Sequence, residues 1–345
     1  MVQDSRGLPI AAILGAILTY GITCLVILKP ISILLEKTGP QKTFRLHIIS
    51  ELLKYLSLLS IFAFPTYALF FFLACQFFNA FNVMLSRIPL TAYFSAYGDN
   101  NKRGQQIGLT NNIQLISGVL MPIITGAFIQ ETGIVIITTI IFVANVIATF
   151  ILTFDERVKI KNPVQIKQLF KNVPRAFTNS FFFGKLAYPF AADLLSIYIA
   201  IALHSFTVLG IFIGLRTGAS IFLNYLVGRV TDTKNIRYLY FWGVILSSTF
   251  WLILPFVHTS YAIFALQFTL GLAGLITTIP FEGAYHNVAK ESDTPLQFAL
   301  WREIAIQGGL VVGTLITMLI LWTGVVSNWQ SLLPFGALSV LAMLF

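Results

Sequence analysis

The feature that most constrains the fold of this chain is a series of long apolar runs separated by short polar segments. Eleven runs are long enough to cross a bilayer, whose apolar core of about 30 Å requires roughly 20 helical residues. They cover residues 9–29, 47–64, 67–88, 107–129, 133–153, 179–202, 207–228, 237–256, 261–281, 303–323 and 330–345. Only 10% of the residues are charged, against about 25% in soluble domains. The chain is therefore predicted to be an all-α polytopic membrane protein, because a backbone in lipid must satisfy its own hydrogen bonds.

The charges between the runs predict the orientation of the chain. Basic residues gather after the first, third, fifth and seventh runs, whereas the loops between these hold no Lys or Arg. The positive-inside rule makes the basic loops cytoplasmic and places the N-terminus outside. Such an N-terminus without a signal peptide is most simply explained by a missing first helix. The basic residues behind the net charge of +9 lie mostly in these loops, where the orientation of the chain explains them. The charge therefore does not indicate a nucleic-acid partner.

A short charged turn after the seventh run has a looser copy after the first run. Each copy contains an acid, a residue that tolerates a left-handed backbone and a following base. The residues concerned are Glu36, Lys37, Gly39 and Lys42 in the first copy, and Gly228, Asp232 and Arg237 in the second. The third and ninth runs also end alike, on Ile88-Pro89 and Ile279-Pro280. Internal similarity of this kind is typical of transporter repeats.

On these turns, the basic segment after the fifth run and the two similar halves, the chain resembles the major facilitator superfamily. That family carries the loop signature G-x-x-x-D-R-x-G-R-R after its second helix and again after its eighth. Gly228 and Asp232 match the second copy, with Arg237 on a basic position, while Glu36 and Gly39 stand for the acid and the glycine of the first. In this register the first run is the family's second helix, so the family's first helix is absent and its twelfth is truncated.

The resemblance implies a fold of two helical bundles with about 11 of the family's 12 transmembrane helices. The N-terminal bundle is predicted over 1–153 with five spans, and the C-terminal bundle over 179–345 with six, the last truncated. Residues 154–178 form a basic cytoplasmic linker, either a helix lying on the inner leaflet or a plain tether. Two departures argue against a proton-driven drug antiporter: Gln76 replaces an arginine, and Met121–Gly126 keeps only the proline and last glycine of a glycine-proline signature.

Two ionisable residues lie deep inside predicted spans, where each costs roughly 2.5–3.5 kcal/mol on insertion scales. Asp193 is in the sixth span and Arg216 in the seventh, at matching distances from the turn near His204. We expect them to pair. The pair either lines the cavity and is linked to substrate or proton, or is a structural bridge that neutralises both charges.

Polar side chains elsewhere in the spans are further candidates for the substrate cavity. Gln76, Asn79 and Asn82 recur at three-residue spacing in the third span, and the first two are predicted to line the cavity. Gln114 and Gln307 place amides at equivalent positions in the two halves, where they bind solute or join helices.

Charged residues at the span ends and in the repeated turns are predicted to form a cytoplasmic gate. Glu282 closes the ninth span, and Arg302 and Glu303 open the tenth; ordinary helix-end anchors are the alternative. The two turns, by resemblance, latch neighbouring helices and release them as the halves rock. Glu51 and Lys54 are predicted to pair locally at the start of the second span.

These features predict a secondary transporter of the cell membrane, a monomer that moves a small solute, with or without a coupled proton or cation. An enzyme is disfavoured, since the sequence has neither a paired-acid D-D-x-x-D motif nor a nucleotide-binding G-x-x-x-x-G-K-[ST] motif. Cys24 and Cys75 lie inside apolar runs without metal-ligand spacing, so neither a cofactor nor a metal is predicted. An inactive or scaffolding fragment of such a transporter, or less readily a membrane-embedded enzyme, remains the alternative.

Overall fold

The computed structural model describes residues 10–109, 134–151, 173–186, 223–232, 236–257, 260–292, 294–323 and 333–344. Every regular element within these ranges is a helix, which confirms the all-α prediction. The α-helices are α1 (Ile10–Arg45), α2 (His47–Ala63), α3 (Ala68–Tyr97), α5 (Ile134–Ile151), α7 (Arg175–Leu186), α10 (Ile236–Ile253), α11 (Ser260–Glu291), α12 (Pro295–Thr323) and α13 (Leu333–Leu341). Short 3₁₀ turns cover Pro65–Tyr67, Asn100–Lys102, Leu254–Phe256 and Ala342–Leu344, and residues 103–109 and 223–232 are also helical.

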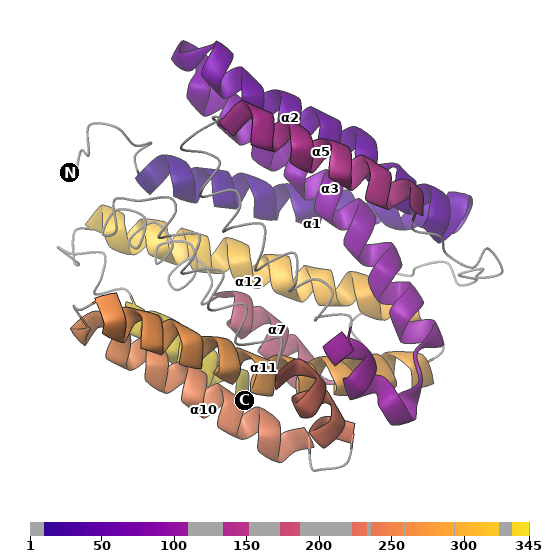
Figure 1. Ribbon diagram of the computed structural model, residues 1–345, viewed down its shortest axis with the longest axis vertical. Coiled ribbons are helices and arrows are strands. Elements are labelled where there is room, and N and C mark those ends of the chain that lie inside the picture. The colour runs from indigo at the N-terminus through magenta and orange to yellow at the C-terminus, as the bar shows by residue number, and fades with distance from the viewer. Residues whose placement is uncertain are drawn as a thin grey trace.

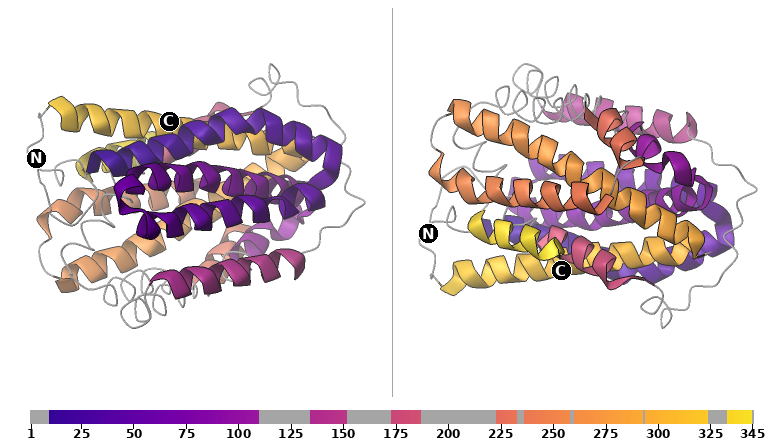
Figure 2. Two further views of the ribbon diagram at one scale, coloured as in Figure 1. Left: turned by 90° about the horizontal axis from the view of Figure 1, so that it is seen from above. Right: turned by 90° about the horizontal axis from the view of Figure 1, so that it is seen from below.

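The helices form two groups that correspond to the two halves of the chain. α1, α2, α3 and α5 lie together in the upper part of Figure 1, and α7, α10 and α11 lie in the lower part. α12 lies between them, in contact with α1 and α3 as well as with α7. The two views of Figure 2 show that the long helices run roughly along one common direction. This arrangement brings α1 and α3 from the first half against α11 and α12 from the second.

Several helices continue well beyond the apolar runs that predicted them. The third run was expected to end at 88, but α3 extends to Tyr97 with Pro89 inside it. Ile88, Ala92 and Ser95 are buried at helical spacing on both sides of that proline, so packing carries the helix onward. Arg87, which stands next to the end of the predicted run 67–88, therefore lies well inside α3. This corrects the sequence prediction.

The helices α1, α11 and α12 are likewise longer than predicted. α12 begins at Pro295, a favoured residue for the first helical position, which places Arg302 and Glu303 about two turns inside the helix and not at its opening. Glu282 also lies inside its helix, because α11 continues to Glu291. In α1 the helix runs to Arg45 and is broken at Gly39, whose φ of 79° confirms its assignment as a turn residue.

The most extensive hydrophobic cluster of the described residues lies between the two halves. It combines Cys24 to Leu35 of α1 and Ala80 to Ala92 of α3 with Phe181, Tyr285 and the segment 296–306. A separate cluster joins α10, α11 and α13 within the second half. The interface between the halves is therefore a packed hydrophobic core where these segments of α1, α3 and α12 meet.

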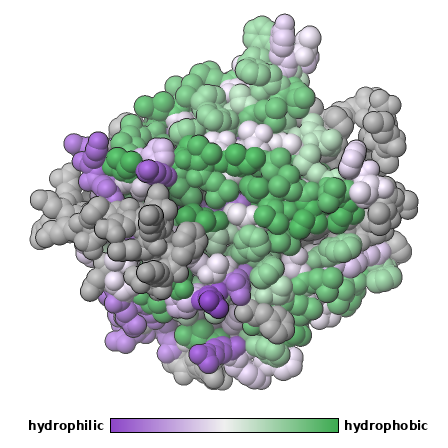
Figure 3. Space-filling model, turned by 180° about the vertical axis from the view of Figure 1, so that it is seen from behind, coloured by the Kyte–Doolittle hydropathy of each residue, from purple (hydrophilic) through white to green (hydrophobic). Residues whose placement is uncertain are grey.

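The outer surface of the molecule is strongly apolar. Large side chains such as Phe70, Ile151, Phe256 and Trp322 are mostly exposed. Figure 3 shows hydrophobic residues across the middle of one face, with hydrophilic ones gathered toward its left and bottom. Among the described residues, four segments are long and apolar enough to cross a membrane: Ala11–Arg45, Pro65–Tyr97, Ile236–Phe256 and Pro295–Thr323. Such a surface suits lipid, whereas soluble proteins rarely expose large apolar patches.

Candidate functional site: a charge cluster between the two halves

A group of charged side chains lies where α3 meets α11 and α12. We call it the interface cluster; its members are Arg87, Glu282, Arg302, Glu303 and Gln307. Its centre is the Glu303 carboxylate, whose side chain is 1% exposed. Oε1 accepts from Arg302 Nη1 at 3.3 Å, and Oε2 accepts from Gln307 Nε2 at 3.3 Å. Arg87 Nη1, which comes from α3, lies 3.6 Å from Oε2. One carboxylate of the second half thus binds cations from both halves.

The Arg302 guanidinium is the second centre of the cluster. Its Nη2 donates to Oε1 of Glu282 at 2.7 Å. Its Cζ lies 5.2 Å from the ring centroid of Phe181 and 5.9 Å from that of Tyr285, within range of cation–π attraction. Its Nε is buried without a hydrogen-bond partner, as is the hydroxyl of Tyr285. The guanidinium is therefore held by two acids and two rings but uses only part of its donor capacity.

Burial gives this cluster its energetic weight. Glu303 and Gln307 are each 1% exposed, and they stand one helical turn apart on the same face of α12. An unpaired charge left in such a place costs about 3–5 kcal/mol. The charges of Arg87, Arg302, Glu282 and Glu303 balance as a set, so a change that moves α3 away from α12 must separate Arg87 from Glu303.

A second set of contacts joins α3 to α11 nearer their C-terminal ends, the end that the loop charges predict to be cytoplasmic. The hydroxyl of Ser95 lies 2.7 Å from Nδ1 of His286, and both residues are buried. Lys290 Nζ donates to the carbonyl oxygen of Gly98 at 2.8 Å. These contacts tie together residues that are almost two hundred positions apart, so they hold the two halves closed at this end.

Arg103 adds a third link between the same helices. Its Nε donates to Oδ1 of Asn287 at 3.1 Å, and its Nη1 donates to the carbonyl oxygen of Phe94 at 2.7 Å. Burial lowers the pKa of the Arg103 guanidinium from its ordinary value, while Asp99 acts in the opposite direction. The hydrogen bonds are what make a buried guanidinium tolerable here.

The charged turn at Asp232 makes another close contact between the halves. Its carboxylate accepts from the backbone N–H groups of Gly104 at 2.8 Å and Gln105 at 3.1 Å, in the first turn of helix 103–109. A carboxylate is favourable there because the first amides of a helix point outward with partial positive charge. A Cβ added to Gly228 would lie 2.5 Å from the carbonyl oxygen of Gly104, so glycine permits this approach.

The first copy of the turn is arranged differently. Glu36, Lys37 and Lys42 are exposed on the last turns of α1. Arg237, the base of the second copy, is also exposed, at the start of α10. Among the described residues of the two turns, Asp232 and Gly228 of the second copy contact the first half.

A further buried charge lies within the first half and joins α2, α3 and α5. Glu51 accepts from Lys54 Nζ at 2.8 Å and from Asn145 Nδ2 at 3.0 Å, and also from the amide of Asn82. We call these four residues the bundle node. The local Glu51–Lys54 pair is confirmed. Asn82 faces α2 inside its own half.

The structure leaves other predicted site residues open. Asp193, Arg216 and Gln114 lie outside the described residues. Gln76 and Asn79 are half-buried on α3, and their predicted role at a cavity stays a prediction. Gln307 joins Glu303 in the interface cluster. Glu282, Arg302 and Glu303, which are predicted to join one cytoplasmic gate, lie together; the gate itself stays a prediction.

Sequence reasoning missed Arg87, Ser95, His286 and the amide partners of Glu51. A signal for Arg87 existed: buried residues continue at helical spacing past the third run, which indicates a longer helix. No local signal pointed to Asn145, since its contact with Glu51 spans 94 positions.

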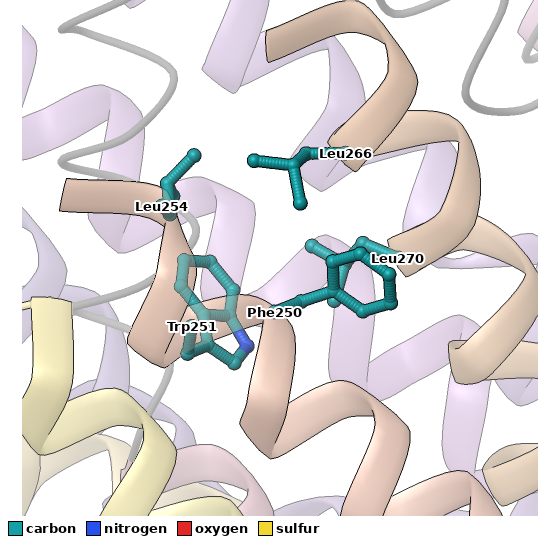
Figure 4. Close-up of a pocket in the computed structure, with 5 residues that line it drawn as sticks. All are labelled: Phe250, Trp251, Leu254, Leu266 and Leu270. Carbon is teal, nitrogen blue, oxygen red and sulfur yellow. The ribbon is translucent and has the colours of Figure 1, made fainter. Parts of the chain in front are cut away.

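Among the described residues, a small pocket, with a cavity volume of only about 10 Å³, opens between α10 and α11. Phe250, Trp251, Leu254, Leu266 and Leu270 line it, as Figure 4 shows. The lining is entirely apolar and lies within the second half, away from the charged residues described above. It offers no polar group to orient a solute, so we do not assign it to the functional site.

The fold is similar to those of known transporters. FucP, a major facilitator superfamily transporter solved in the outward conformation, matches with a TM-score of 0.65 at 13% identity, over 99% of this chain and 90% of FucP. A variant of the E. coli fucose:proton symporter FucP gives a TM-score of 0.60 at 11% identity, over 97% of each chain. The human organic anion transporter MFSD10 gives 0.62 at 13% identity, over 97% of this chain and 82% of that one. No family model and no curated protein sequence matches the chain. The chain therefore has the fold of major facilitator superfamily transporters over nearly its whole length.

Proposed function

With the major facilitator fold as its premise, we propose that this protein is a secondary active transporter that moves a small solute by alternating access. Its two halves rock about a substrate site near the middle of the membrane. The observation that carries the proposal is the bond from Arg87 of α3 to Glu303 of α12, a buried charge contact that spans the two halves. A transporter needs contacts of this kind that form in one state and break in the other.

In this proposal the cytoplasmic gate has two parts. One is the interface cluster, and the other is the contact of the Asp232 carboxylate with the first turn of helix 103–109. The contacts of Ser95 with His286 and of Lys290 with Gly98 lie at the same end and close with it. The arrangement corresponds to a state that is shut on the cytoplasmic side. The two bundles are assigned to 1–153 and 179–345, with eleven spans and a basic linker at 154–178.

The substrate site itself is proposed to include the predicted pair Asp193–Arg216, with Gln76, Asn79, Gln114 and Gln307 as polar lining. Coupling to a proton or cation would act through the buried acids. The protein acts without a cofactor, as a monomer in the cell membrane.

A labelling experiment tests the gate. Ser95, fully buried at the interface, is replaced by Cys in a background where Cys24 and Cys75 are replaced by Ser. In inside-out vesicles, an impermeant maleimide should label Ser95→Cys slowly, and the added change Glu303→Gln should raise the rate severalfold because it weakens the link between the halves. Glu291→Gln, at an exposed acid on the last turn of α11, is the matched control. Equal rates with Glu303→Gln and with Glu291→Gln would contradict the gate.

Transport is tested in proteoliposomes by counterflow of a panel of radiolabelled small solutes. A solute that accumulates with wild-type protein identifies a substrate, and Asp193→Asn and Arg216→Gln should then abolish its uptake. Unchanged uptake in both variants would exclude the ion pair from the mechanism. Normal gate opening without counterflow of any solute would favour a scaffolding role.

A further inference from the structure

Three polar atoms of the interface region are buried and lack hydrogen-bond partners: Arg302 Nε, the Tyr285 hydroxyl and Gln307 Oε1. Buried polar groups are nearly always satisfied, so each such atom calls for an explanation. Tyr285 is 0% exposed and Gln307 is 1% exposed, so these side chains cannot turn to bulk water. Two of the three groups, the Arg302 guanidinium and the Tyr285 hydroxyl, are donors on neighbouring side chains, since Cζ of Arg302 lies 5.9 Å from the centroid of the Tyr285 ring. Two adjoining free donors are suited to an acceptor.

The edge of the Arg302 guanidinium decides which acceptor fits. Nε and Nη2 point in parallel along one edge, and this edge binds both oxygens of a carboxylate. Glu282 occupies Nη2 with one oxygen at 2.7 Å, while Nε beside it has no partner. Glu282 therefore makes half of the contact that this edge offers. A ligand carboxylate that takes both nitrogens makes the complete one.

Arg302 pairs with two acids, and releasing Glu282 from it costs less than releasing Glu303. Its side chain is 22% exposed, against 1% for Glu303, so Glu282 can turn toward water. Glu303 keeps Nη1 of Arg302 and the amide of Gln307 as partners when a ligand takes the Nε/Nη2 edge. The cluster therefore contains one replaceable acid and one fixed acid.

Aromatic rings border the same guanidinium. Phe181 and Tyr285 both lie within cation–π range of Arg302, and Trp301 lies 6.5 Å from Phe181 between ring centroids. A flat apolar body attached to a carboxylate would meet ring surfaces here. The described side chains fill this contact, so a ligand enters when α3 moves away from α11 and α12, which is the motion of the proposed gate.

We propose that Arg302 is the anion-binding residue of the transporter and that it binds a carboxylate carried on a flat apolar or aromatic body, which replaces Glu282 on the Nε/Nη2 edge. This inference rests on the proposed function and names the substrate class of its site. Tyr285 donates its hydroxyl to the same carboxylate. Glu282 acts as an internal competitor that holds Arg302 when no ligand is bound.

Binding of 4-fluorobenzoate and of 4-fluorobenzamide, followed by ¹⁹F NMR with purified protein in lipid nanodiscs, tests the assignment. The two probes have the same ring and differ in charge. Wild-type protein should bind the acid at least tenfold more tightly than the amide, and Arg302→Gln should remove that preference. Equal binding of the two probes, or an unchanged preference in Arg302→Gln, would overturn the proposal.

Replacement of Glu282, the internal competitor, should change probe binding in the opposite direction to Arg302→Gln. Glu282→Gln should tighten 4-fluorobenzoate binding about three- to tenfold, because an uncharged amide releases Arg302 more readily. A purely structural Glu282 would yield weaker or unchanged binding, and either result would overturn the competitor role. Glu291→Gln is the matched acid control and Arg175→Gln, at an exposed arginine of α7, is the matched base control.

A folding defect in Arg302→Gln is separated from lost recognition by Arg302→Lys. Lysine keeps a positive charge for Glu282 and Glu303 but has no paired edge, so a folded Arg302→Lys protein should lose most of the preference. If Arg302→Lys kept the full preference for the acid over the amide, it would overturn the proposal that the carboxylate binds both Nε and Nη2 of Arg302. Maleimide labelling at Ser95→Cys does not depend on the fluorinated probes. If Glu303→Gln speeds labelling but the protein does not prefer the acid, only the assignment of the substrate class is contradicted. If Glu303→Gln leaves the labelling rate unchanged, the proposed function itself is contradicted.

Discussion

The bundle node and the interface cluster are each built around a buried glutamate, but they bind different parts of the chain. Glu51 is 4% exposed and takes donors from α2, α3 and α5, all in the first half. Glu303 is 1% exposed and takes donors from α12 and, across the interface, from Arg87 of α3. The same chemistry thus stabilises one half internally in the first case and joins the two halves in the second.

The donor-to-carboxylate distances are also shorter around Glu51 than around Glu303. Lys54 and Asn145 approach Glu51 at 2.8 and 3.0 Å, whereas Arg302, Gln307 and Arg87 stand 3.3 to 3.6 Å from Glu303. Shorter charge-assisted bonds are stronger. A tight node keeps a helical bundle rigid, and a looser cluster between bundles can separate during a transport cycle. This difference suits a protein whose halves move as bodies.

The largest expected effect is on the bundle node. Glu51→Ala leaves the Lys54 ammonium and two amides without their acceptor, so it should lower the unfolding free energy by about 3–5 kcal/mol. Reversible unfolding in mixed SDS micelles measures the change. If the node is internal to one half, Ser95→Cys labelling rates under native conditions should stay unchanged. A large rise in those rates would show that the node also acts on the gate.

Gly228→Ala should have the next largest effect, on the interface alone. The new Cβ would lie 2.5 Å from the carbonyl oxygen of Gly104, which forces helices 103–109 and 223–232 apart. Overpacking of this kind costs about 1–3 kcal/mol. We expect faster maleimide labelling at Ser95→Cys, which reports opening. Gly15→Ala is the control, because a Cβ there meets nothing within 4 Å. Equal labelling in the two variants would mean that the close approach does not limit opening.

Asp232→Asn should have a smaller effect. The amide retains one acceptor for the two backbone N–H groups but loses the charge that favours the helix N-terminus, a change of about 1 kcal/mol. A modest rise in labelling should follow, and it should shrink as salt is raised, because salt screens the charge that Asp232→Asn removes. Labelling as slow as in the parent protein would indicate that hydrogen bonding, and not charge, holds this cap.

Arg87→Gln should have the smallest effect on stability. Its side chain is 41% exposed and its bond to Glu303 is long, so solvent screening limits the pair to about 0.5–1 kcal/mol. The labelling rate should still rise by about two- to fivefold, because this bond crosses the interface. Arg175→Gln serves as control. A loss of stability as large as that of Glu51→Ala would remove the distinction between the two clusters.

Several parts of this architecture were predictable because they depend on local sequence. Among the described residues, the apolar runs correctly placed the cores of the helices, and Gly39 and the Glu51–Lys54 spacing correctly indicated a turn and a local pair. Helix ends were predicted less well. A hydropathy run ends where polar residues become frequent, whereas α3 and α12 continue wherever buried positions recur, so Arg87 and Glu303 were placed near helix ends and not inside their helices.

The sequence by itself determined that this is a helical membrane protein, because the thickness of the bilayer acts on each segment separately. Only the tertiary structure decided that Arg87 meets Glu303, that Asp232 caps helix 103–109 and that Glu51 gathers two distant amides. Those partners are far apart in the chain and leave no periodic signal. They come together because burial of a charge is tolerated only where the packed helices supply its partner.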